Sequence, residues 1–372
     1  MARLAAFRSH HANHRHLMEW RPSSFGLSRR VDALVVPTAR PVSWMRESMA
    51  LAAALDCVLV AVCSGRNSAA DATHLGQELR VPTVALDMAD CGDVLTPTSA
   101  GALIKNSQFE HNTDVSYKRN LALLLARIAG WESLLFIDDD IYDLNPKDAM
   151  VAVGLLDRYA AVGLRNAGFP DNSVVCHVFR AVGGPQEQFI GAGAMAVSPM
   201  RTRSFFPVNY NDDWFYFLGD AQPLRVAMTG SMQQKKFDPF AKVDRARGEE
   251  LGDCLAEGLF WLLDERLPLD RADQEYWQTS IGRRARFIER LLVRVTRVID
   301  DADLQTRMLA SLSAALDINQ EITADLCAEY VRRWGSDLAS WQQFIDGTPT
   351  DLGIDGALDY LDLSGVAHRS GA

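Results

Sequence analysis

Residues 133–140 read SLLFIDDD, an apolar run that leads directly into three aspartates. A short, continuous apolar run of this kind is typical of a strand buried on both faces of a parallel sheet. Three adjacent like charges repel one another, and a turn needs only one Asp or Asn, so the triplet favours a bound cation. The alternative is an acidic turn that caps the next helix. We therefore expect an α/β fold with a ligand at the carboxyl end of this strand.

Similar apolar runs precede and follow this strand and alternate with segments of helical pattern. Such alternation predicts a mostly parallel, Rossmann-like sheet with helices on its faces. The expected strands are residues 32–36, which end at Pro37, and residues 58–62, 83–86, 133–137 and 161–164. The expected helices of this part are residues 43–55, 115–129 and 147–159.

The chain divides by composition into three parts. Residues 1–30 carry an excess of arginine and four histidines, and we expect a basic, disordered tail there. Residues 31–245 form the expected α/β domain. Residues 246–372 follow as a C-terminal α-helical region, with helix-like segments at 249–263, 273–298, 303–316 and 323–334 and a frayed end.

The role of the C-terminal helices stays open at the level of sequence. Residues 282–300, GRRARFIERLLVRVTRVID, are basic and amphipathic, so this segment either packs against the α/β domain or lies on a membrane surface. The helices are also a candidate surface for a homo-oligomer.

Composition excludes several classes of protein. The chain has 372 residues, 48% of them hydrophobic, which is too apolar for a disordered protein. Its formal charge of −10 argues against a nucleic-acid partner. The six cysteines are dispersed and contain no CxxC pair, so we expect reduced, buried thiols. No transmembrane segment or leader is evident, and we expect a cytoplasmic protein.

Five motifs, in order, resemble those of the GT-A class of nucleotide-sugar glycosyltransferases, close to family 2. The resemblance covers about residues 31 to 240. The motifs are Pro37-Thr38-Ala39-Arg40-Pro41 after the first strand, Lys118-Arg119-Asn120 at a helix start, Asp138-Asp139-Asp140 as the DxD motif, Gly191-Ala192-Gly193-Ala194 as the small-residue segment, and Asp212-Asp213 as the acidic pair.

The resemblance implies transfer of a sugar from a nucleotide-diphosphate donor to an acceptor hydroxyl, with Mn²⁺ or Mg²⁺ as cofactor. It implies that Asp138 and Asp140 hold the metal and that Asp213 or Asp212 is the catalytic base. The donor-binding residues that it implies are Pro37, Thr38, Arg40, Lys118, Arg119, Asn120, Asp138, Asp139, Gly191 and Gly193. The acceptor is unidentified.

The chain departs from these motifs at two places. Cys63-Ser64-Gly65-Arg66-Asn67 replaces the acidic cluster after the second strand, and Asp87 or Asp90 could take over recognition of the base. No histidine lies between Asp213 and His368, whereas many retaining GT-A enzymes have a late metal-ligating histidine. This absence favours the inverting reaction.

Several of these residues also have simpler interpretations. Lys118 and Arg119 could form an exposed helix face, and Asp213 could cap a helix. The aromatic run 214–217 could stack on a sugar or pack in the core. His177, in strand-like surroundings, could contact the acceptor or a metal, or lie in the core. Gly191 and Gly193 could mark a bulge.

Three other functions remain as alternatives. A sugar-phosphate nucleotidyltransferase would keep the fold, but the loop after the first strand lacks a phosphate-binding run of glycine and lysine. A DxD-type phosphatase of the haloacid dehalogenase kind would use Asp138 as its nucleophile, but three expected strands precede that residue. A non-catalytic interaction protein would use the C-terminal helices as its binding surface.

Overall fold

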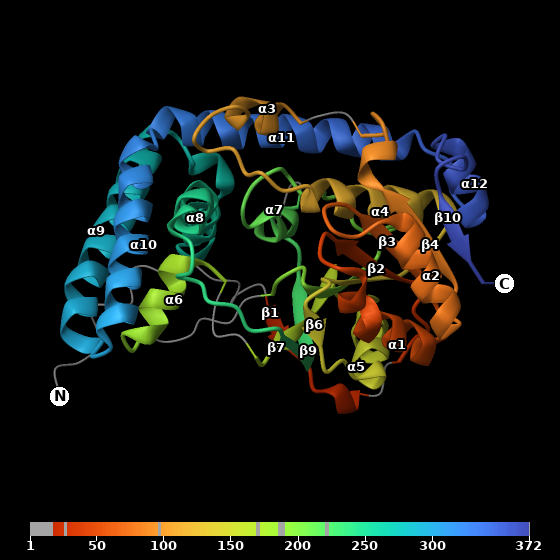
Figure 1. The fold of residues 1–372 in the computed structure, drawn as a ribbon. Coiled ribbons are helices and arrows are strands. Elements are labelled where there is room, and N and C mark those ends of the chain that lie inside the picture. Colours follow the sequence, from red (N-terminus) through yellow and green to blue (C-terminus); the bar gives the residue numbers. More distant parts are fainter. Residues whose placement is uncertain are drawn as a thin grey trace.

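The computed structural model describes residues 18–25, 28–95, 98–168, 172–184, 190–219 and 223–371. Its strands form a sheet in the order β1-β9-β7-β8-β5-β2-β3-β4-β10, and β6 pairs with β9 (Figure 1). The strands are β1 (Met18–Trp20), β2 (Ala33–Thr38), β3 (Val58–Cys63), β4 (Thr83–Asp87), β5 (Leu134–Ile137), β6 (Ile141–Tyr142), β7 (Ala161–Asn166), β8 (Ala194–Val197), β9 (Val226–Gln234) and β10 (His368–Ser370).

The sheet is mostly parallel, and its strand order reverses beside β2. Strand β2 pairs in parallel with β3 on one side and with β5 on the other. Strand β8 is antiparallel to both β5 and β7, and β10 is antiparallel to β4. Ligands of open α/β sheets bind at the carboxyl ends of strands where the order reverses. Here that position lies between the ends of β2 and β5, and the aspartate triplet follows β5.

Side chains alternate along the strands, so both faces of the sheet need a cover of helices. Leu34 and Val36 of β2 face one core, and Ala33 and Val35 face the other. The first core is covered by η3 (Val42–Met45), α1 (Arg46–Leu55), α2 (Ala69–Leu79) and α5 (Pro146–Leu155). The second is covered by α3 (Ser99–Ile104), α4 (Val115–Ala129), α7 (Asp212–Leu218), α8 (Val243–Asp264), α11 (Ala324–Asp346) and α12 (Gly353–Tyr360).

A third apolar cluster joins α6 (Val174–Ala181) to α9 (Gln274–Val298) and α10 (Ala302–Glu321). Figure 1 shows α9 and α10 at one end of the molecule and α12 with β10 at the other, with α11 running between them. Short 3-10 turns occur at η2 (Ser23–Phe25), η4 (Met88–Asp90) and η5 (Leu269–Arg271). The α/β fold with a mostly parallel sheet is thus confirmed.

Both ends of the described chain are more ordered than we expected. Residues 18–20, placed by the sequence in a disordered tail, form strand β1 beside β9. Residues 1–17 lie outside the described residues. At the other end the chain does not fray, because Ala357, Leu358 and Leu363 are buried in the core that α4 also lines. This packing carries β10 back to the edge of the sheet.

Three local expectations also need correction. Strand β2 does not end at Pro37 but continues to Thr38, since Pro37 lies beyond the last residue that pairs with β5 and so needs no donor on that side. His177 lies in helix α6, where the Ser173 side chain accepts a hydrogen bond from the Cys176 N–H and caps the helix. The boundary expected near residue 245 falls inside α8, and one apolar core includes both Leu251 and Phe136.

The six cysteines are buried free thiols, as expected. Among the described residues, every helix is too short or too polar to cross a bilayer.

Helix α8 approaches the loop before α7 through a glycine, which gives the first prediction. A Cβ on Gly252 would lie 2.3 Å from the Tyr210 carbonyl oxygen, whereas a Cβ on Gly248 would meet no atom within 4 Å. We expect Gly252→Ala to destabilise the fold by about 1–3 kcal/mol through overpacking. Gly248→Ala, the matched control, should stabilise it by about 0.5–1 kcal/mol through helix propensity. Equal effects in urea unfolding would contradict this packing.

Candidate active site

The first turn of α4 carries three consecutive buried polar side chains, and each holds a different part of the site. Lys118 Nζ donates to the Thr38 carbonyl oxygen at 2.8 Å and to Ser64 Oγ at 2.7 Å, and it pairs with Asp114 at 2.9 Å. These contacts tie α4 to the ends of β2 and β3. Since the ammonium group has three N–H groups and three acceptors, its expected role as a phosphate ligand is not supported.

Asn120 is also used inside the protein. Its Nδ2 donates to the Phe206 carbonyl oxygen at 2.7 Å, and its Oδ1 accepts from the Phe206 N–H at 2.8 Å. The side chain thereby fixes the segment that leads to α7. Lys118 and Asn120 are only 2% and 7% exposed, so neither forms an exposed helix face.

Arg119, which lies between them, bridges two parts of the expected site. Its Nη2 donates to the Asp138 carboxylate at 3.0 and 3.2 Å, and its Nη1 donates to Asp212 at 2.9 and 3.1 Å. Ser116 Oγ also donates to Asp212. Burial lowers the pKa of Arg119, but the charges of Asp212 and Asp138 outweigh it and raise the pKa above its ordinary value. The guanidinium group is therefore a fixed cation between the two carboxylates.

The small-residue segment before β8 closes the site from the other side. The Gly193 carbonyl oxygen accepts from the Asp138 N–H at 2.9 Å, and the Ala192 N–H donates to the Asp213 carboxylate at 3.0 Å. A Cβ on Gly193 would lie 3.3 Å from Asp138 Oδ2, so a glycine suits this close approach. Adjacent residues thus hold the DxD motif and the acidic pair, which lie 75 positions apart in the sequence.

The two aspartates that begin α7 differ in environment. Asp212 is ion-paired to Arg119, whereas Asp213 is partly exposed and accepts hydrogen bonds from the N–H groups of Ala192 and Trp214. Burial raises the pKa of Asp213 to about 7, and the charge of Asp212 adds to the rise. Of the two, Asp213 is therefore the carboxylate poised to exchange a proton near neutral pH.

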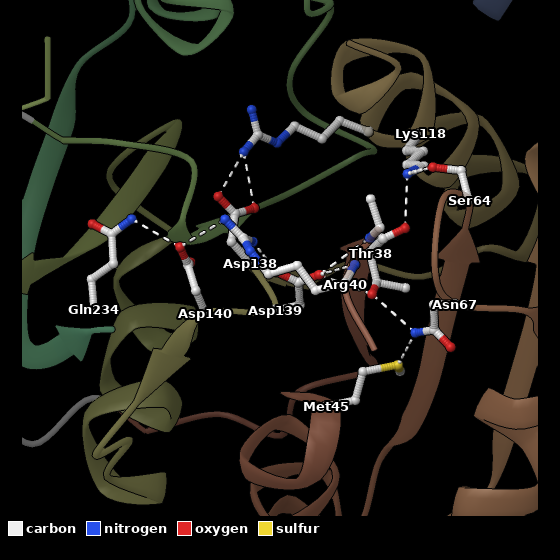
Figure 2. Close-up of polar contacts among 12 residues, drawn as sticks. Thr38, Arg40, Met45, Ser64, Asn67, Lys118, Asp138, Asp139, Asp140 and Gln234 are labelled. Carbon is white, nitrogen blue, oxygen red and sulfur yellow. Dashed lines mark hydrogen bonds and ion pairs between the residues drawn. The ribbon is translucent and has the colours of Figure 1, made fainter. Parts of the chain in front are cut away.

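Asp139 has a structural role. Its carboxylate accepts hydrogen bonds from Thr38 Oγ1 at 2.9 Å and from the N–H groups of Ala39 and Arg40, both at 3.2 Å, and it pairs with the Arg40 side chain. Figure 2 shows Asp139 turned toward Thr38 and away from Asp140, which points toward Gln234. The buried Asp139 thus ties the turn after β5 to the loop after β2, and its expected contact with the donor is not supported.

The Asp140 carboxylate contacts one side chain that the sequence pointed to, Arg40, and one that it did not, Gln234. Arg40 Nη2 lies 3.2 Å from its carboxylate, and Gln234 Nε2 donates to it at 3.2 Å. Arg40 stacks on Trp44, whose ring also has Lys235 Nζ 4.0 Å from its centroid. Gln234 and Lys235 were missed because Gln234 ends β9, a strand that we did not expect, and Lys235 follows it. The polar run QQKK after its apolar residues was the available signal.

The donor set around Asp138 and Asp140 fits a hard divalent cation. Burial raises the pKa of Asp140, and the charge of Asp138 adds to it, so a cation would relieve a real repulsion. Five carboxylates gather at this site, and the guanidinium groups of Arg40 and Arg119 pair with four of them. The carboxylates are Asp138, Asp139, Asp140, Asp212 and Asp213. Two carboxylate ligands leave coordination positions for phosphate oxygens, as Mg²⁺ and Mn²⁺ require.

A second acidic group lies behind the site and fits an ion pair better than a metal. Within the described ranges, Cys176, Asp253 and Glu257 alone offer three metal-ligand atoms within 4.8 Å of one another. The buried Arg284 already donates to Asp253 at 2.8 Å and to Glu257 at 2.7 Å. This guanidinium group neutralises the cluster and would repel a cation.

The same network reaches the candidate base through the loop before α7. Asn211 Nδ2 donates to Asp253 at 2.7 Å, and Asn211 holds the left-handed backbone with φ of 63° just before Asp212. Arg284 of α9 also binds Glu250 of α8 at 2.6 Å. Helix α8, held by Arg284 of α9, thus contacts the loop that leads to the acidic pair.

The remaining predicted residues take mostly structural positions. Thr38 and Pro37 end β2, and Gly191 precedes Ala192 in the segment before β8. Residues 214–217 are at most 3% exposed and pack in the core, so they do not stack on a sugar. Asp87 accepts the Ala69 N–H at the start of α2, whereas Asp90 is exposed.

Comparison with known proteins adds little. No protein-family model and no curated protein matches the sequence. A solved structure of the mannosyltransferase PcManGT from Pyrobaculum calidifontis, in complex with GDP-Man and Mn²⁺, is similar over 93% of this chain and 88% of that chain. Its sequence identity is 13% and its TM-score 0.40, a value that does not establish a common fold.

The raised pKa of Asp213 predicts a pH-dependent stability difference. An unfolded aspartate ionises near pH 3.8 and the folded one near pH 7, so stability falls as pH rises between these values. We expect the melting temperature of Asp213→Asn, relative to the natural protein, to increase from about pH 4 to about pH 7 and then to level off. For the control Asp143→Asn, which removes an exposed charge, the melting-temperature difference from the natural protein should not increase in this way. A constant Asp213→Asn difference would contradict the assignment.

Proposed function

We propose that the protein is a metal-dependent glycosyltransferase with a GT-A-like site, which moves a sugar from a nucleotide-diphosphate donor to an acceptor hydroxyl by inversion. One observation carries this proposal. A carboxylate pair suited to a divalent cation and a separate aspartate with a pKa of about 7 are held by adjacent residues, Gly193 and Ala192. Metal-assisted departure of a diphosphate and removal of a proton from an attacking hydroxyl need these two groups in one site.

The chain's own groups can divide the work of the transfer. Asp138 and Asp140 would hold the metal, which when bound supplies Lewis-acid stabilisation of the departing diphosphate. Arg40, whose side chain is 43% exposed, and Lys235 offer further donors to phosphate oxygens. Asp213 accepts the acceptor's hydroxyl proton as the new glycosidic bond forms. The charge of Asp212 favours a proton on Asp213.

The alternatives agree less well with these contacts. A nucleotidyltransferase needs a phosphate-binding loop after β2, but Asp139 already accepts the N–H groups of Ala39 and Arg40. A DxD phosphatase would carry its nucleophile near the start of the domain, but strands β2, β3 and β4 precede Asp138. A purely non-catalytic protein gives no reason for adjacent residues, Gly193 and Ala192, to hold Asp138 and Asp213 in one site.

The first test of the proposal is nucleotide binding. We expect calorimetry with UDP, GDP and TDP to show binding of one of them in the presence of Mn²⁺ and its loss with EDTA. Asp138→Asn and Asp140→Asn should each weaken this binding at least about tenfold, because each removes a charged ligand. Asp143→Asn is the matched control, since Asp143 is exposed and its left-handed backbone also suits asparagine. Binding that ignores EDTA, or none at all, would contradict a metal-dependent transferase.

The second test concerns the base. With the sugar nucleotide that matches the bound diphosphate, slow hydrolysis can be followed without knowledge of the acceptor. We expect the rate to rise with pH up to about 7, because Asp213 must be ionised to take a proton. Asp213→Asn should lower the rate about 10²–10⁴-fold while nucleotide affinity stays unchanged. An unaltered rate would exclude Asp213 as the base, and a parallel loss of nucleotide affinity would assign it to donor binding instead.

A further inference from the structure

Helix α9 presents a regular row of arginines to solvent. Arg283, Arg286, Arg290, Arg294 and Arg297 follow one another at spacings of three and four residues, which places them on one face of the helix. From the first to the last, the row covers about 21 Å. We call these five residues the arginine face.

A neighbouring face of α9 is buried inside the protein. Phe287, Ile288, Leu291 and Val295 are buried and pack in the cluster with α6 and α10. The apolar face of residues 282–300 thus packs inside the protein, whereas the basic face lies on the surface. The arginine face is therefore what α9 offers to a partner, and Figure 1 shows α9 at an outer end of the molecule.

Two of the five arginines have a partner inside the protein. Arg283 pairs weakly with Glu265 at 3.8 Å, and Arg294 donates to the Val182 carbonyl oxygen. Within the described ranges, Arg286, Arg290 and Arg297 are exposed and form no ion pair. A concentrated positive face is unusual in a chain with a formal charge of −10.

Acidic neighbours frame this face without covering it. Glu289 is exposed at its border, and Asp300 and Asp301 are exposed beyond its end. Val293 and Val298, at 51% and 43% exposure, lie on and beside the face. The face is thus cationic and aliphatic. Trp277 and Phe287 of the same helix are buried, and Trp261, on which Arg283 stacks, is half-buried.

We propose that the arginine face docks the protein on an anionic lipid bilayer. Its charge complements anionic headgroups, and a flat row of cations on a straight helix matches a planar surface. The exposed valines add an aliphatic contact with the interface. A nucleic acid fits less well, because bases need exposed aromatic side chains to stack on and the rest of the chain is acidic. This docking is electrostatic and does not depend on the proposed reaction.

The test is sedimentation of the full chain with phosphatidylcholine vesicles, with and without phosphatidylglycerol. We expect binding to the anionic vesicles alone and its loss at high salt. The triple variant Arg286→Gln, Arg290→Gln, Arg297→Gln should bind about 100-fold more weakly, at about fivefold for each arginine. Each single variant should lose about fivefold, so the test does not depend on folding of the triple variant.

A matched control removes three exposed charges elsewhere, with Arg80→Gln, Lys105→Gln and Arg332→Gln. If the bilayer binds the arginine face and does not respond to total charge, this control should bind anionic vesicles with an affinity within about twofold of that of the natural protein. Equal loss in the control, equal binding to neutral vesicles, or no vesicle binding would overturn the proposal. Tighter binding to a DNA oligonucleotide than to anionic vesicles would overturn it in favour of a nucleic-acid partner.

Discussion

The buried guanidinium group of Arg119 is the constraint on which the site depends. A cation with 5% exposure is costly unless it is paired, and Asp138 and Asp212 supply the pairs. Arg119 lies in α4 between Lys118, which binds the ends of β2 and β3, and Asn120, which binds the segment before α7. These contacts fix the position of the Arg119 guanidinium group, and thereby the carboxylates that pair with it. Removal of Arg119 would leave two carboxylates without their cation.

This arrangement separates two kinds of carboxylate within one site. Asp138 and Asp140 lie at the end of β5 with cationic partners, where a divalent cation would lower the repulsion between them. Asp213 forms no ion pair with the residues that the structure describes, and burial raises its pKa to about 7. Environments that drive the proton affinities of nearby acids apart are what acid–base chemistry at neutral pH needs. Asp253 of α8 accepts a hydrogen bond from Asn211 and so helps to hold the loop before Asp212 and Asp213.

Much of the fold could be predicted from local pattern, because continuous apolar strands and amphipathic helices such as α4 leave a clear periodic signal. The predictions that were wrong concern segments whose structure depends on contacts with residues far away in the sequence. Strand β1 exists because β9 pairs with it, and His177 lies in a helix because Ser173 caps an apolar run that fits either structure. In the candidate site, Asp138, Asp140 and Asp213 could be singled out from residue type. The structural roles of Lys118, Asn120 and Asp139 could not, since their partners come from other elements.

The most direct measurement of the central claim is the position of a bound metal. Crystals grown with Mn²⁺ and the nucleoside diphosphate that binds can be examined by anomalous diffraction at the manganese edge. The account predicts one peak within coordinating distance of the Asp138 and Asp140 carboxylates, with the diphosphate completing the metal's ligands and Arg119 still bridging Asp138 to Asp212. A peak at Cys176, Asp253 and Glu257, or a diphosphate bound away from the ends of β2 and β5, would contradict it.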